Sequence, residues 1–135
     1  MSSNAFEKGL EKRREVLGKD HVDRSLAAAD DFTRPLQELV TEYCWGEVWT
    51  RPALSAKVRS IMNLCMLTAL NRPHELKLHV RGAINNGCSA EEIMEVFLQT
   101  AVYCGAPAAL DSTRIAREAL KELNIPVDLQ PVKNP

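Results

Sequence analysis

Long hydrophobic runs, closely paired cysteines and strand-like alternation are all missing from this sequence. The apolar stretch from Ile61 to Leu70 is interrupted by Asn63 and Thr68 and is too short to cross a bilayer, so we expect no membrane segment. The four cysteines form no CxxC motif, and the opening residues MSSNAFEKGLEKRREVLG contain no secretory leader. These absences predict a cytoplasmic protein with reduced thiols.

Charge of one sign is also lacking, because 17 basic residues stand against 18 acidic ones and the net charge is -1. No long basic block is present, so nucleic acid is not an expected ligand. The cysteines and the three histidines show no spacing typical of metal ligands, and we therefore assign no metal. A chain of 135 residues fits one domain with a real hydrophobic core.

What the chain does contain is helical periodicity, which recurs between glycine and proline punctuation and predicts an all-α fold. We expect a single-domain bundle of about six helices over residues 1–125 and an extended or disordered tail over 126–135, where three prolines occur. The expected helices are about Ala5 to Leu17, Asp31 or Thr33 towards Trp45, Ser55 to about Leu70, Pro73 to Asn86, Ala90 to about Cys104 and Ala108 to Leu123, with a short helical piece from His21 to Ala29.

The helix after Ser55 is the best candidate for the centre of the core. Its apolar residues share one broad face, which we expect to be buried: Val58, Ile61, Met62, Cys65, Met66 and Ala69. Further along, Ser89 and Glu92 match a capping box, and Gly18 and Gly87 are typical helix stops.

The first candidate site lies in NRPHELKLHVRGAINNG, residues 71–87. On a helix, Arg72, Glu75 and His79 would fall on one stripe at the border of the buried face. Burial and neighbouring charges can shift a pKa there. An ordinary glutamate and histidine pair on a solvated helix face explains the same spacing equally well.

The second candidate is EYCWGEVWTRP, residues 42–52, which holds both tryptophans of a chain with only 5% aromatic residues. Trp45 and Trp49 are most simply core or interface anchors, and Glu47 with Arg51 could be an ion pair. Alternatively, the tryptophans wall a pocket in which Glu47 or Arg51 reaches a polar ligand.

The third candidate is VYCGAPAAL, residues 102–110, where small residues surround a helix start at Gly105. Free backbone N–H groups at such a start could bind a carboxylate or an enolate oxygen. Tight helix packing accounts for the same small residues.

Together these stretches resemble the carboxymuconolactone decarboxylase family. The matching segments are YCWGEVWTRPALSAKVRS, ALNRPHELKLHVRGAINNGCSAEEI and LQTAVYCGAPAAL, and the resemblance is nearly continuous from Tyr43 to Leu110. It implies an all-helical, alkylhydroperoxidase D-like fold that assembles into homo-oligomers, commonly trimers or hexamers.

Redox relatives in the wider superfamily carry a CxxC motif followed by a histidine. The resemblance places His79 at the position of that histidine, and the two cysteine positions fall on Arg72 and Glu75. Thiol peroxidase chemistry is therefore not expected.

The resemblance implies decarboxylation of 4-carboxymuconolactone to β-ketoadipate enol-lactone, in the protocatechuate branch of aromatic catabolism. The lactone is its own electron sink, so no cofactor is required. The alternatives are an enzyme of the same fold acting on another carboxylated lactone or keto acid, and a non-catalytic oligomeric binding module.

The resemblance also suggests roles for the candidate residues. His79 would protonate the dienolate carbon, with Glu75 orienting it or raising its pKa, and Glu47 is the alternative acid. The guanidinium groups of Arg72 and Arg51 would bind the carboxylates of a small anionic lactone. Backbone N–H groups near Gly105 could stabilise the oxyanion, and Trp45 and Trp49 would line the pocket.

Overall fold

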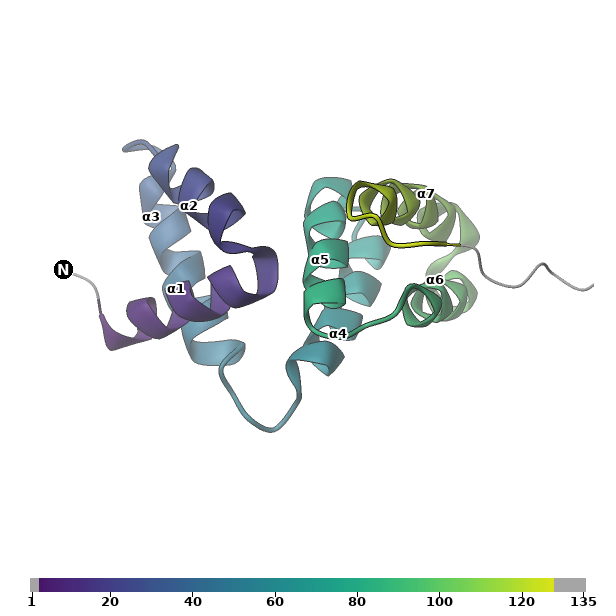
Figure 1. Cartoon of the computed structure of the whole chain (residues 1–135), viewed down its shortest axis with the longest axis horizontal. Coiled ribbons are helices and arrows are strands. Elements are labelled where there is room, and N and C mark those ends of the chain that lie inside the picture. Colours follow the sequence, from purple (N-terminus) through teal and green to yellow (C-terminus); the bar gives the residue numbers. More distant parts are fainter. Residues whose placement is uncertain (1–2, 128–135) are drawn as a thin grey trace, which may run out of the picture. The chain divides into compact units, whose positions relative to one another are not determined.

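The computed structural model describes residues 3–127, and within that range every regular element is a helix (Figure 1). This confirms the all-α prediction. No helix in this range is long and apolar enough to cross a membrane. The elements are α1 (Asn4–Leu17), α2 (Lys19–Ala27), α3 (Arg34–Leu39), the π-helix η1 (Val40–Val48), α4 (Ala56–Ala69), α5 (Pro73–Asn85), α6 (Ala90–Cys104) and α7 (Ala106–Glu122).

Most helix ends lie where local signals predict them. The Ser89 hydroxyl accepts a hydrogen bond from the Glu92 backbone N–H at 3.1 Å, and the Glu92 carboxylate accepts one from the Ser89 N–H at 3.0 Å, which completes the capping box that begins α6. Gly18 ends α1 with φ 96° and Gly87 follows α5 with φ 95°. Both glycines adopt backbone conformations that side chains disfavour.

The chain forms two compact units, Met1–Arg59 and Ser60–Pro135. In the first unit α1 crosses the continuous helix formed by α3 and η1 (Figure 1). The crossing is close because of two glycines: a β-carbon on Gly9 would collide with the Thr41 carbonyl, and one on Gly46 with the Ala5 carbonyl. Beside this contact, the buried Arg13 donates a hydrogen bond to the Thr41 hydroxyl at 2.9 Å.

The predicted α-helix towards Trp45 becomes a π-helix after Leu39. Its wider turns run from Val40 to Val48, so the expectation of regular α-helix was wrong there. Hydrogen bonding in a π-helix spans five residues instead of four, as in the Trp49 N–H to Cys44 carbonyl bond of 3.0 Å.

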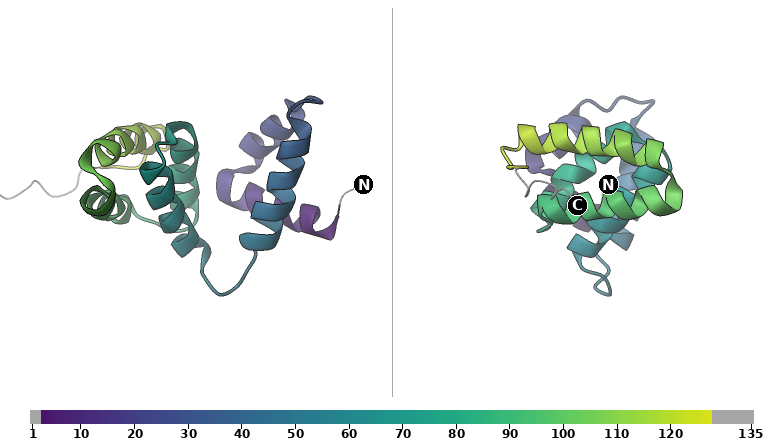
Figure 2. Two further views of the ribbon diagram at one scale, coloured as in Figure 1. Left: turned by 180° about the vertical axis from the view of Figure 1, so that it is seen from behind. Right: turned by 90° about the vertical axis from the view of Figure 1, so that its right-hand side faces the viewer.

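The second unit has a core made by α4, α5, α6 and α7. In the right-hand view of Figure 2, α6 and α7 run side by side, and they pack together in the structure. Their core residues include Leu64, Leu76, Val80, Ile93, Phe97, Ala116 and Leu120. Ile125 and Val127 extend past α7 and pack against this cluster, whereas the rest of the predicted tail, 128–135, lies outside the described residues.

The predicted buried face of α4 is only partly correct. Ile61 and Cys65 pack against the core, but the fully buried row is Ser60, Leu64 and Thr68. The most apolar row instead faces solvent, with exposed fractions of 40%, 43% and 48% for Val58, Met62 and Met66. The polar row turns inward because it faces α5, where Ser60 has a hydrogen-bonding partner.

Candidate active site

A polar seam joins α4 to α5 inside the second unit. The Asn86 side-chain amide donates to the Ser60 hydroxyl at 2.9 Å, and the Asn63 amide nitrogen lies 3.4 Å from Nδ1 of His79. Later residues of α4 pair with earlier residues of α5, so the two helices run antiparallel. The seam brings His79 together with a residue 16 positions away in the sequence.

His79 is buried at this seam, with 8% of its surface exposed. Burial lowers the pKa of His79 to about 4, because an imidazolium loses its hydration there. The expectation that Glu75 raises this pKa was therefore wrong: Glu75 lies one turn away on α5 but is exposed, and desolvation dominates. His79 is a neutral imidazole at physiological pH.

This shift predicts a stability loss on acidification. The unfolded chain takes up a proton on His79 near pH 6.5, but the folded chain does so only near pH 4. Stability should consequently fall as pH drops from about 6.5 to about 4, by roughly 3 kcal/mol for this residue. Urea unfolding across this range measures the loss. In His79→Gln, the free energy of unfolding should depend less on pH between these values. Equal pH slopes for both proteins would contradict the assignment.

Arg72 and Glu75 differ from the predicted stripe. Arg72 is the N-cap residue of α5, with φ -114° and ψ 75°, so it lies outside the helix and its direction is not set by helical spacing. Both side chains are exposed, unlike His79. Arg72 and Glu75 therefore lie in solvent at the start of α5, whereas His79 lies further along the helix and is buried.

In the first unit, the structure brings the two tryptophans together. The Trp45 and Trp49 rings stack with centroids 4.7 Å apart and an interplanar angle of 24°, and both side chains are buried. This confirms their interpretation as core anchors, and lining a pocket remains a prediction. Glu47 and Arg51 are exposed, and no ion pair between them is seen. The Arg51 carbonyl accepts a hydrogen bond from the Arg59 guanidinium at 3.2 Å.

Gly105 joins α6 to α7 with φ 113°. Its own N–H donates to the Ala101 carbonyl at 3.1 Å. The oxyanion role of backbone N–H groups near Gly105 therefore concerns the first turn of α7 and stays a prediction. A β-carbon here would meet only Pro107, at 4.0 Å, so close packing does not explain the glycine. The positive φ angle of Gly105 explains why a glycine is found here, because other residues disfavour that backbone conformation.

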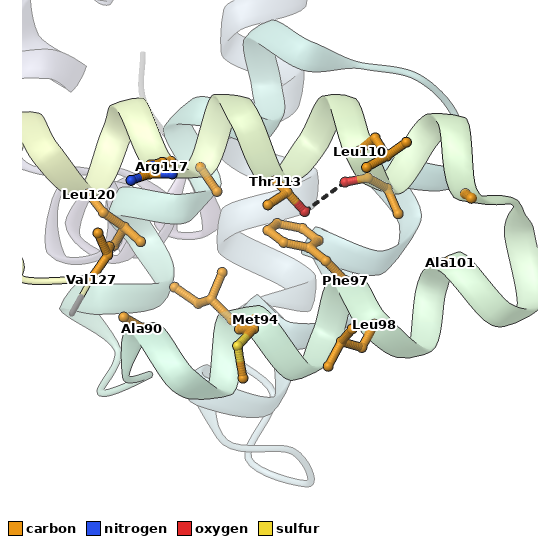
Figure 3. A pocket seen from close by; sticks show the side chains of 14 residues that line it. Ala90, Met94, Phe97, Leu98, Ala101, Leu110, Thr113, Arg117, Leu120 and Val127 are labelled. Atoms are coloured by element: carbon orange, nitrogen blue, oxygen red, sulfur yellow. Dashed lines mark hydrogen bonds between the residues drawn. The ribbon is translucent and has the colours of Figure 1, made fainter. Parts of the chain in front are cut away.

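A cavity of about 410 Å³ lies between α6 and α7 (Figure 3). Ala106, Ala109 and Leu110 of the third candidate stretch line it, whereas the candidate residues of the other two stretches do not. Its walls are almost entirely apolar. The hydroxyl of Thr113 is engaged with the Ala109 carbonyl at 2.8 Å, and Arg117 supplies a single cation. A small dianion needs more polar partners than this, so we do not place the reaction here. The lining includes Met94, Phe97, Leu98, Leu110, Leu120 and Val127.

The four cysteines are all free thiols in the part of the chain that the structure describes. Among residues 3–127, no group of histidine, cysteine, aspartate and glutamate side chains could hold a metal ion.

Comparison with known proteins assigns the chain. The sequence profile of the carboxymuconolactone decarboxylase family matches residues 34–118. The chain belongs to this family. The matched segment contains α3, η1, α4, α5 and α6 and most of α7, and hence every candidate residue above.

Individual relatives in the family include two decarboxylases. The chain is 41% identical over 120 residues to 4-carboxymuconolactone decarboxylase of Acinetobacter baylyi, covering 89% of this chain and 90% of the relative. It is 42% identical over 118 residues to nitrosuccinic acid decarboxylase of Metarhizium robertsii, covering 87% and 82%. An uncharacterised 15.0 kDa protein of Paracoccus denitrificans is 31% identical over 106 residues, covering 76% and 77%.

Sequence reasoning missed one residue of the site, Asn63. In the sequence it appears only as a polar interruption of an apolar stretch, because its contact to His79 joins two helices. A polar residue at the edge of a buried helix face is the signal that could have found it.

Proposed function

We propose that this protein is a carboxy-lyase that converts 4-carboxymuconolactone to β-ketoadipate enol-lactone and CO2. The main support for this function is the 41% identity to the Acinetobacter baylyi enzyme, which extends over 89% of the chain. Such an enzyme serves the protocatechuate branch of the β-ketoadipate pathway. The structure also supports this function, because it contains a buried, neutral imidazole, that of His79.

The chemistry requires no external electron sink. The bond between the ring carbon and its carboxylate breaks, and its electron pair moves through the alkene to the lactone carbonyl oxygen. CO2 leaves, and a dienolate remains. A proton from solvent or a side chain is then added at the α carbon. The protein must bind two carboxylates, stabilise the oxyanion and admit the proton.

His79 is best suited to the second of these tasks. A neutral imidazole with a pKa of about 4 is rarely protonated at pH 7, so it is a poor acid towards carbon. It remains a good hydrogen-bond donor to a developing oxyanion, in the same way that a neutral histidine polarises a carbonyl in triosephosphate isomerase. We therefore propose His79 as the oxyanion donor. Glu47 remains a candidate acid.

Arg72 is proposed to bind a substrate carboxylate. It is exposed at the N-terminus of α5, where the helix dipole also favours an anion. Arg72→Ala should raise KM about tenfold or more with a smaller change in kcat, since a lost charge-assisted hydrogen bond costs roughly 1.5–3 kcal/mol. Steady-state kinetics measure this, with Arg114→Ala on the exposed face of α7 as the control. An unchanged KM would make Arg72 a structural residue. Arg51 is the second candidate for this role.

In the decisive experiment, the purified protein is assayed with freshly generated 4-carboxymuconolactone and, separately, with nitrosuccinic acid. The second substrate is included because the Metarhizium robertsii relative is 42% identical. Its nitro group is also an internal electron sink for the adjacent carboxylate, so a similar site could serve both reactions. CO2 release and the ultraviolet spectrum give kcat/KM for each. A higher value for nitrosuccinic acid would overturn the proposed substrate, and no CO2 from either would favour a binding module.

We also propose that the protein acts in the cytoplasm as a homo-oligomer, as a trimer or hexamer. The exposed apolar row Val58, Met62 and Met66 on α4 supports assembly, because such a row is costly to leave in water. Light scattering coupled to size exclusion measures the mass. A monomer at micromolar concentration would contradict this proposal.

A further inference from the structure

We propose that Asn63 is a positioning residue, whose side-chain amide holds His79 in the tautomer that carries its proton on Nε2. This inference deepens the proposed decarboxylation and rests on it for the catalytic consequence alone. The tautomer itself can be measured without substrate.

The contact at the seam favours one direction for the hydrogen bond. The Asn63 amide nitrogen lies 3.4 Å from Nδ1 of His79, and an amide nitrogen can only donate. Nδ1 must then accept, which it does only when it carries no proton. In a neutral imidazole the single proton is consequently on Nε2.

The surroundings keep this arrangement in place. His79 is 8% exposed and Asn63 is half-buried, so the pair competes with few water molecules. Both residues project from packed helices rather than from loops, and the neighbouring Asn86 to Ser60 hydrogen bond of 2.9 Å ties the same two helices together. The imidazole is thus held in one tautomer and one orientation by rigid elements.

The catalytic consequence follows from the tautomer. An oxyanion is stabilised by a donor that already points at the place where charge develops. A histidine with its proton on Nε2 can donate from that nitrogen, whereas the other tautomer would present a lone pair there and repel the oxygen. Asn63 would therefore act on the reaction only through His79.

The experiment compares two matched substitutions on the seam. Asn63→Asp places a carboxylate near Nδ1, which favours a proton on that nitrogen. Asn86→Asp makes the same chemical change in the same helix pair, at a residue bonded to Ser60. Proteins labelled with 15N at histidine are examined by long-range proton–nitrogen NMR at pH 7.5, with His79→Gln used to assign the His79 signals. Kinetics with 4-carboxymuconolactone are measured in parallel.

We expect an unprotonated Nδ1 and a protonated Nε2 for His79 in the wild type and in Asn86→Asp. In Asn63→Asp, Nδ1 should become protonated and kcat should fall at least tenfold, with KM changed less than threefold. A wild-type His79 protonated on Nδ1, or an unchanged pattern in Asn63→Asp, would overturn the proposal. If NMR gives the expected tautomers but no variant decarboxylates the lactone, the positioning of His79 stands and the proposed function fails.

Discussion

Replacing His79 by alanine is expected to lower kcat for decarboxylation at least 100-fold. An oxyanion donor in a site sheltered from water is worth about 3 kcal/mol, which corresponds to a factor of this size. His79 is buried and its imidazole is neutral, so the loss should come from a missing hydrogen bond rather than from a missing charge. KM should change less, because the oxyanion exists only as the bond breaks.

The matched control is His74→Ala, which removes an exposed imidazole from the first turn of the same helix. It should retain wild-type kcat. His79→Gln is a second comparison, because its amide can donate from near the position of Nε2, and it should recover part of the activity lost in His79→Ala. Circular dichroism should show equal helix content in all these proteins. Wild-type turnover by His79→Ala would remove the histidine from the mechanism.

The largest expected effect on stability comes from Gly46→Ala. A β-carbon at Gly46 would collide with the Ala5 carbonyl, which is backbone and cannot rotate away. The two helices would have to separate. Overpacking typically costs about 1–3 kcal/mol, and we expect a collision with backbone to lie at the upper end of that range. We expect the free energy of unfolding to fall by about that amount and the melting temperature by about 10 °C.

Helix propensity alone would predict the opposite result, because alanine stabilises a helix relative to glycine by up to about 1 kcal/mol. Glu47→Ala is the matched control, because it changes the neighbouring, exposed residue of η1 and should leave stability nearly unaltered. Thermal and urea unfolding measure both variants. A Gly46→Ala protein as stable as the wild type would show that α1 can move away from η1 without loss.

Local signals in the sequence predicted the helix ends well. The Ser89 and Glu92 capping box depends on residues within one turn, and Gly18 and Gly87 act through their own backbone conformation. Such features need no knowledge of the rest of the fold. The π-helix was missed because its residues do not differ visibly from those of an α-helix, and the contact of Gly9 with η1 comes from a distant segment.

Long-range contacts explain the remaining errors. Helical spacing pointed to Glu75 as the partner of His79, since the two are four residues apart, but the contact is made by Asn63 on α4. Likewise, counting apolar residues on α4 favoured the row with Val58 and Met62, although the row with Ser60 is the one that faces α5. Periodicity identifies an apolar face but does not say which surface covers it.

The tryptophan stack also makes one half of the molecule spectroscopically distinct. Both tryptophans of the chain, Trp45 and Trp49, lie in the unit Met1–Arg59, and the unit Ser60–Pro135 contains none. Tryptophan fluorescence, excited where tyrosine does not absorb, therefore reports only on the first unit, whereas far-ultraviolet circular dichroism reports on the helices of both. Denaturation curves from the two signals will coincide if the chain unfolds as one cooperative domain, and they will separate if each unit melts independently.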